Sequence, residues 1–78
     1  ATMDEDAMFA MGSVLAALGG ILERNGICTT NELAETIGGI AVMTADAGEQ
    51  YQRRAAYIGS WAHMVRAAAQ GAGRKNQN

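Results

Sequence analysis

The chain has 78 residues and a net charge of −2, with 18% charged and 49% hydrophobic residues. This length allows one small domain whose core is near the minimum for independent folding. Residues 1–38 carry six acids and one base, whereas residues 39–78 carry five bases and two acids. This division does not match the basic footprint of a nucleic-acid-binding protein. The single cysteine, Cys28, excludes an internal disulfide and is typical of a reducing, cytoplasmic setting.

A run of sixteen residues without charge, 7–22, is the first distinctive segment. Three acids precede it, whereas a secretory signal begins with positive charge. The run is also shorter than the roughly twenty apolar residues that span a bilayer. We therefore expect a helix that is buried on more than one side, with no membrane contact.

The first helix is expected over residues 4–24, because acids occupy its first turn and Asn25-Gly26 supplies a left-handed stop. Its apolar positions step by 3, 4, 3 and 4, which is the spacing of a heptad seam. We expect this seam to face the core or a second copy of the chain: Met8, Met11, Leu15, Leu18 and Leu22. A second stripe lies beside it and consists of Ala7, Val14 and Ile21.

Small residues recur every four positions on another face of the same helix, at Gly12, Ala16 and Gly20. Such a strip permits the backbone of a neighbouring element to approach closely.

The second helix is expected over residues 29–46. Thr29 and Glu32 have the spacing of a capping box, in which each side chain receives a backbone N–H of the other residue. Gly38-Gly39 interrupts the helix-favouring sequence, but the apolar period continues across the pair from Ile37 to Ile40. We therefore expect one continuous helix.

The third helix is expected over residues 49–70, after a connection at Ala47-Gly48. Two sets of residues repeat at intervals of seven along it: Tyr51, Ile58 and Val65, and Arg54, Trp61 and Ala68. The segment 71–78 is polar and glycine-rich, and we expect a flexible tail there.

These elements predict an all-α fold: one small three-helix domain over residues 1–70. The first helix is apolar over most of its circumference, and two further helices can cover only one flank of it. Since a small monomer rarely leaves such a flank open, we expect a symmetric homodimer with this helix at or near the two-fold axis.

The segment "ILERNGICTTNELAETIGG" resembles the start of many winged-helix DNA-binding domains. The resemblance implies that the next segment, "IAVMTADAGEQ", is a recognition helix. That segment is apolar and offers no base before Arg53, whereas phosphate contact requires clustered lysine and arginine. A helix-turn-helix transcriptional regulator is therefore kept as an alternative function.

Two further segments, "NELAETIGGIAVMTADAG" and "RRAAYIGSWAHMVR", resemble the C-terminal helices of ArdC-type antirestriction proteins, which carry a zincin-like metallopeptidase domain. The resemblance covers residues 31–66, and its most specific piece is "AAYIGSW". It implies that Glu32 or Glu35 corresponds to a metal ligand. This chain has one histidine, His63, and no His-Glu-x-x-His motif. The resemblance therefore implies a shared packing unit or mobile-element ancestry, with a metal-less remnant as a second alternative.

No metal-ligand set, catalytic triad, paired-carboxylate pocket or cofactor loop occurs in the sequence. We therefore expect no catalytic residue, no metal site, no cofactor and no enzymatic activity. The favoured interpretation is a small helical interaction or dimerisation module in the cytoplasm, encoded by a mobile element, whose partner is a second copy or another protein. The candidates for binding a partner are Arg53, Arg54, Trp61 and His63.

Overall fold

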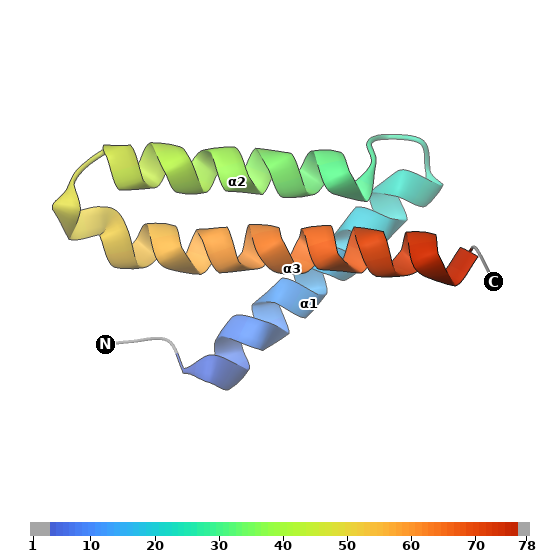
Figure 1. Ribbon diagram of the computed structural model, residues 1–78, viewed down its shortest axis with the longest axis horizontal. Coiled ribbons are helices and arrows are strands. Elements are labelled where there is room, and N and C mark those ends of the chain that lie inside the picture. The colour runs from blue at the N-terminus through green and yellow to red at the C-terminus, as the bar shows by residue number, and fades with distance from the viewer. Residues whose placement is uncertain (1–3, 77–78) are drawn as a thin grey trace.

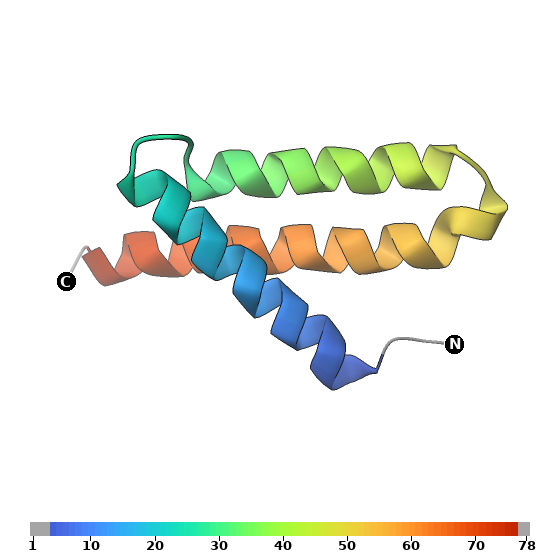
Figure 2. The same ribbon diagram turned by 180° about the vertical axis from the view of Figure 1, so that it is seen from behind.

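The structure is a computed structural model that describes residues 4–76, with side chains described up to residue 71. It contains three α-helices, α1 (Glu5–Arg24), α2 (Thr30–Asp46) and α3 (Gln52–Asn76), and a short 3-10 helix, η1 (Glu49–Tyr51), that leads into α3. Residues 4–76 include no strand, so the expected all-α fold is confirmed. α2 and α3 form an antiparallel hairpin, and α1 crosses one face of this hairpin diagonally (Figure 1, Figure 2).

The first two helices begin one residue after the expected positions and end where expected. The third differs more. Its first three expected residues form η1, and α3 continues to Asn76, six residues beyond the expected end. Residues 71–76 are thus helical, where we expected a flexible tail. No proline stops the helix, and α3 continues through Gly71 and Gly73 as α2 continues through Gly38-Gly39. The last two residues of the expected tail, 77–78, lie outside the described residues.

The ends of the first two helices are capped. The caps at Thr29–Glu32 and at Gly26 were predicted from the sequence, whereas Asp4 was expected inside the first turn of α1. Asp4 caps α1, since the backbone N–H of Ala7 donates to Asp4 Oδ1 at 2.7 Å. The capping box of α2 is complete: Glu32 N donates to Thr29 Oγ1 at 3.0 Å, and Thr29 N donates to Glu32 Oε1 at 2.7 Å. Gly26 has a φ of 69°, which is the left-handed conformation expected after α1.

One charged side chain ties α1 to the start of α2. The backbone N–H of Thr30 donates to Glu23 Oε1 at 2.7 Å, although seven residues separate the two positions. This hydrogen bond lowers the pKa of Glu23 below its ordinary value of 4.5, because it favours the ionised carboxylate. The bond sets the corner at which the chain leaves α1 and enters the hairpin.

The buried core is small and lies mainly between the two arms of the hairpin. It consists of Ala34, Ile37, Ala62 and Val65, against which Leu15, Leu33, Ile58 and Trp61 pack while partly exposed. Among the described side chains, Val65 is the largest that is fully buried. α2 passes through Gly38-Gly39 without a break, as expected.

α1 rests on the hairpin through its glycines. Gly12 and Gly19 are the buried residues of α1. A Cβ atom at Gly12 would overlap the side chain of Met64 on α3, and one at Gly19 would lie 3.0 Å from Thr30 Cγ2 and 3.2 Å from Leu33 Cδ2. The expected close approach therefore occurs, but its second glycine is Gly19, whereas the strip predicted from the sequence ends at Gly20.

Gly39 provides a test of this packing, because it has open space around it whereas Gly19 is in close contact with the hairpin. Gly39→Ala should raise the free energy of unfolding by up to about 1 kcal/mol, because the new Cβ has no atom within 4 Å and alanine favours the helix. The matched variant Gly19→Ala should lack this gain, because its Cβ crowds Thr30 and Leu33. Urea denaturation measures both, and equal gains would contradict the packing described for α1.

Glu23 predicts a pH dependence. A carboxylate whose pKa is lowered on folding stabilises the fold above its unfolded pKa, and this contribution disappears as the pH falls through the folded pKa. Glu23→Gln should therefore lower the urea midpoint near pH 7, and its difference from the wild type should shrink as the pH falls below about 4.5. Glu35→Gln, at an exposed position on α2, is the control. A difference for Glu23→Gln that is independent of pH would contradict this role.

Candidate interaction surface

α1 exposes a stripe of large apolar side chains on the side that does not touch the hairpin. The stripe, called the α1 stripe below, consists of Met11, Val14, Leu18 and Ile21, which are 44%, 62%, 44% and 47% exposed. Steps of 3, 4 and 3 place these residues along one face of the helix. An exposed apolar face of this kind makes the α1 stripe a candidate surface for contact with another molecule.

The structure divides the seam expected from the sequence into two parts. Met8, Leu15 and Leu22 are half-buried, and Leu15 packs against the core. Met11 and Leu18 belong to the exposed stripe, together with Val14 and Ile21 of the neighbouring row. The reason is the rotation of α1: with Gly12 and Gly19 against the hairpin, only one edge of the expected seam can reach the core.

α1 also has the length and apolar composition of a membrane-spanning helix, the one such helix in the described part of the chain. The 18-residue window that meets this criterion is only 11% buried. α1 is thus not covered as a core helix would be.

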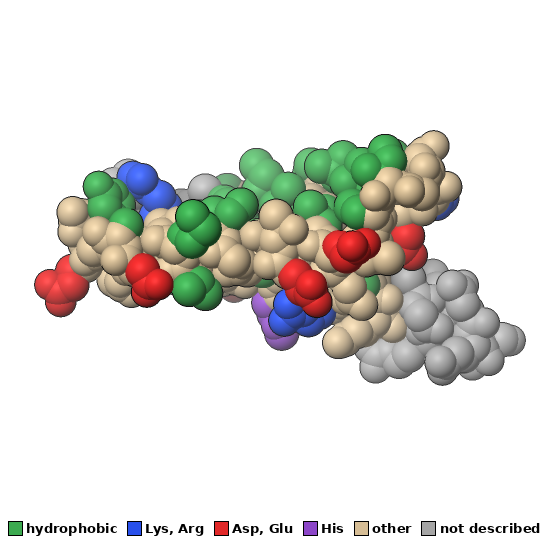
Figure 3. Space-filling view, turned by 90° about the horizontal axis from the view of Figure 1, so that it is seen from above, with side chains coloured by type: hydrophobic (Ala, Val, Ile, Leu, Met, Phe, Trp, Pro, Cys, Tyr) green, Lys and Arg blue, Asp and Glu red, His purple; other side chains and the backbone are tan. Residues whose placement is uncertain are grey.

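Two residues of α2, Ile40 and Met43, extend the apolar surface. They are 48% and 72% exposed. Ile40 projects from the side of α2 that faces α1, because it follows by seven residues Leu33, which lies beside Gly19 of α1. Figure 3 shows hydrophobic side chains gathered along one long side of the molecule, over both α2 and α1. We call the α1 stripe together with Ile40 and Met43 the apolar face.

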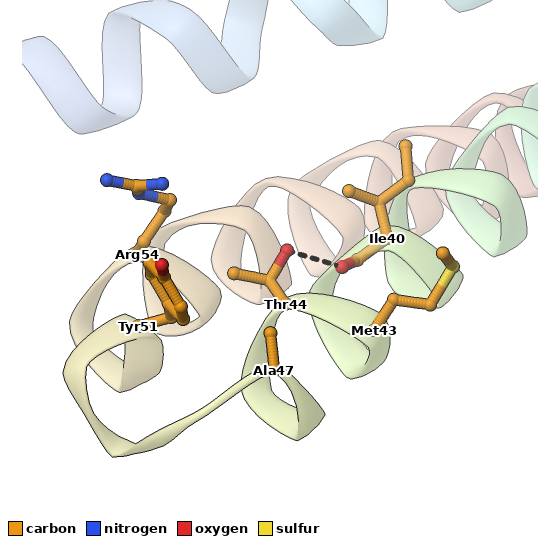
Figure 4. A pocket seen from close by; sticks show the side chains of 6 residues that line it. All are labelled: Ile40, Met43, Thr44, Ala47, Tyr51 and Arg54. Atoms are coloured by element: carbon orange, nitrogen blue, oxygen red, sulfur yellow. Dashed lines mark hydrogen bonds between the residues drawn. The ribbon is translucent and has the colours of Figure 1, made fainter.

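A shallow pocket of about 400 Å³ lies where α2 turns into α3, at one end of the apolar face. This turn pocket is lined by Ile40, Met43, Thr44, Ala47, Tyr51 and Arg54 (Figure 4). The guanidinium carbon of Arg54 lies 5.2 Å from the centre of the Tyr51 ring, a cation–π distance. The hydroxyl of Thr44 donates to the backbone oxygen of Ile40 at 2.8 Å. The pocket therefore offers an apolar floor with one cation at its rim.

Arg54 projects from the side of α3 that faces α1. Trp61, seven residues later, donates its indole N–H to the backbone oxygen of Met8 on α1 at 3.0 Å, which fixes the direction of this side of α3. In Figure 4 the guanidinium of Arg54 points away from the turn. Arg53 is also exposed, and a second shallow pocket of about 300 Å³ lies between the two arginines, Gln50 and Tyr57.

The four residues proposed for partner binding therefore lie in different settings. Arg53 and Arg54 stand together beside the turn pocket. Trp61 is half-buried, and its indole N–H is occupied by α1. His63 is exposed, but two residues after Trp61 it projects from the opposite side of α3. The pair of arginines is the part of the set that adjoins the apolar face.

No group of three or more histidine, cysteine or acidic side chains that could hold a metal occurs within the described residues. The carboxylate of Glu32 accepts the N–H of Thr29, and Glu35 is exposed elsewhere on α2. Cys28 is half-buried in a small pocket of about 220 Å³ beside Glu23 and Glu32, whose carboxylates accept backbone N–H groups. These contacts give both carboxylates a structural role at the start of α2.

Comparison of the chain with models of protein families, with curated proteins and with solved structures finds no match. The resemblances to winged-helix domains and to ArdC-type antirestriction proteins therefore stay predictions.

The divided seam can be tested by truncating one residue from each part. Leu15→Ala should lower the free energy of unfolding by about 2 kcal/mol, because it opens a cavity against the core. Leu18→Ala should cost less than about 1 kcal/mol at low protein concentration, where association contributes least. Urea denaturation measures the free energy of unfolding of both variants. A larger loss of this free energy for Leu18→Ala than for Leu15→Ala would contradict the orientation of α1.

Proposed function

We propose that this protein is a non-enzymatic helical interaction module that binds a second copy of itself through the apolar face. The observation that carries the proposal is the exposure of the α1 stripe, four large apolar side chains in heptad spacing on a helix without charge between residues 7 and 22. In water, such a face is stabilised by covering it with an equally apolar surface.

The distribution of exposed apolar side chains supports this proposal. Five of the large hydrophobic residues that are at least 44% exposed lie on α1, and four of these five form the α1 stripe. A second copy would cover them with an equally apolar surface.

The shape of α1 also suits a helical partner. Ala10 and Ala17 flank the stripe on its outer side, and both are small and exposed. Small flanking residues let a second helix approach closely, so that its side chains fit between Val14, Leu18 and their neighbours. A second copy supplies a helix of the same kind, and a two-fold axis makes the contact self-complementary.

A bilayer and a nucleic acid fit this surface less well. α1 as a whole is long enough to cross a bilayer, but its uncharged part has only sixteen residues, and charged residues occupy both of its ends. A membrane-spanning helix would also have to leave the hairpin. The face of α1 opposite the α1 stripe is held there by the hydrogen bond from Trp61 and by the packing of Gly12. The segment expected to form a recognition helix is the second half of α2 and the turn that follows it, and it continues the helix that precedes it without a break at Gly38-Gly39. A helix-turn-helix instead needs a turn between two helices set at about 90–120°.

The proposal includes a setting. The resemblance of residues 31–66 to antirestriction proteins favours a mobile element as the source, where the helices persist without the histidines of a metal site. In this setting the module would work in the cytoplasm by bringing two chains together.

Val14→Glu tests the proposal. Val14 is 62% exposed, so a carboxylate there leaves the core intact but places charge within the proposed interface. Sedimentation velocity over a concentration series should show a dimer for the wild type and a monomer for Val14→Glu, with equal helical circular dichroism. Ser13→Glu, on another face of α1, is the control and should remain dimeric.

A wild type that stays monomeric throughout the series would overturn the proposal. So would a Val14→Glu variant that remains dimeric. Flotation with phosphatidylcholine vesicles supplies the other arm: a wild type that floats with the vesicles in preference to forming dimers would assign the apolar face to lipid.

A further inference from the structure

We infer that the turn pocket, with Arg54 at its rim and Arg53 beside it, receives the acidic first turn of α1 from a second copy of the chain. This inference rests on the proposed function and specifies which parts of the two copies meet. The acidic turn consists of Asp4, Glu5 and Asp6.

The two arginines are cations without a carboxylate partner among the described side chains. Arg54 is held over the ring of Tyr51, which orients its guanidinium at little further cost in side-chain freedom. The floor below it is apolar, with Ile40, Met43 and Ala47. A ligand that matches this pocket carries a carboxylate next to an apolar side chain.

The start of α1 has this chemistry. Glu5 and Asp6 are exposed and form no ion pair with a described side chain. One carboxylate oxygen of Asp4 accepts a hydrogen bond from the N–H of Ala7. The apolar residue Phe9 follows within one turn and is 48% exposed. Acids at this position are already stabilised by the helix dipole, and a cation beside them would add to that stabilisation.

The arrangement of the chain favours a contact between copies. The acidic start of α1 and the turn between α2 and α3 lie toward the same end of the molecule, but α1 diverges from the hairpin there (Figure 1, Figure 2). The hydrogen bond from Trp61 to Met8 and the packing of Met64 on Gly12 hold α1 in this direction. Among the described side chains, the acids of α1 form no ion pair with the two arginines of the same chain.

α3 lies between α2 and the start of α1 in both views (Figure 1, Figure 2). The arginines at the start of α3 therefore adjoin the apolar residues of α2, and the acids begin α1 on the other side of α3. A two-fold axis makes a contact between the acids of one copy and the arginines of the other reciprocal, so this contact would form twice in one dimer. Complementary charge at both contacts would favour one orientation of the two apolar faces.

Charge reversal tests the inference on the full chain by sedimentation velocity. Arg54→Glu should weaken dimerisation about tenfold in Kd at about 0.05 M salt, since it places two carboxylates together. Arg66→Glu makes the same change in net charge at another exposed position of α3 and should have a much smaller effect. The double variant Glu5→Lys, Asp6→Lys leaves the cap at Asp4 intact and should weaken the dimer to a similar degree as Arg54→Glu.

The decisive arm combines the three substitutions. Arg54→Glu together with Glu5→Lys and Asp6→Lys should restore most of the lost affinity, because the charges are opposite again. If Arg54→Glu behaves like Arg66→Glu, or if the combination restores nothing, the inference is overturned while the dimer stands, since Val14→Glu still dissociates it. A wild type that is monomeric throughout overturns both proposals.

Discussion

The close approach of α1 to the hairpin at Gly12 and Gly19 is the constraint on which the rest of the structure depends. A helix can turn only one face to its support, and here the face without side chains is the one turned inward. The large apolar residues of α1 are consequently left at the side or outside, with Leu15 at the edge of the core and Val14 largely exposed. The exposure of the apolar face is a consequence of this contact, and the proposed dimer would cover that face.

The buried core of a single copy is small, so contacts outside it also matter for stability. In a chain of 78 residues the buried set is dominated by alanines with Ile37 and Val65, so the hairpin alone has little apolar area with which to offset the entropy of folding. Local interactions contribute at the ends of the helices, through Asp4, the Thr29–Glu32 box and the bond from Thr30 to Glu23. Association through α1 would add the buried surface that a single copy does not supply.

The sequence predicted those features that depend on near neighbours along the chain. The caps at Thr29 and Asn25-Gly26 follow from residue type, and the continuity of α2 through Gly38-Gly39 follows from the apolar period. The orientation of α1 could not be predicted in this way. Two overlapping rows of apolar residues have heptad spacing, and the position of the glycines on the hairpin decides between them. The turn pocket likewise required the path of η1, which brings Tyr51 and Arg54 beside Ile40.

Apolar surface and charge contribute differently to such an assembly. An apolar stripe on a helix supplies affinity but tolerates several orientations, because contacts among methionine, valine, leucine and isoleucine are not directional. Charges at the borders discriminate, since a wrong orientation brings like charges together or leaves carboxylates without partners. In this chain three acids stand at the start of α1 and two arginines at the start of α3. In a dimer, this division of charge between the two halves of the sequence would favour one of the arrangements that the apolar face permits.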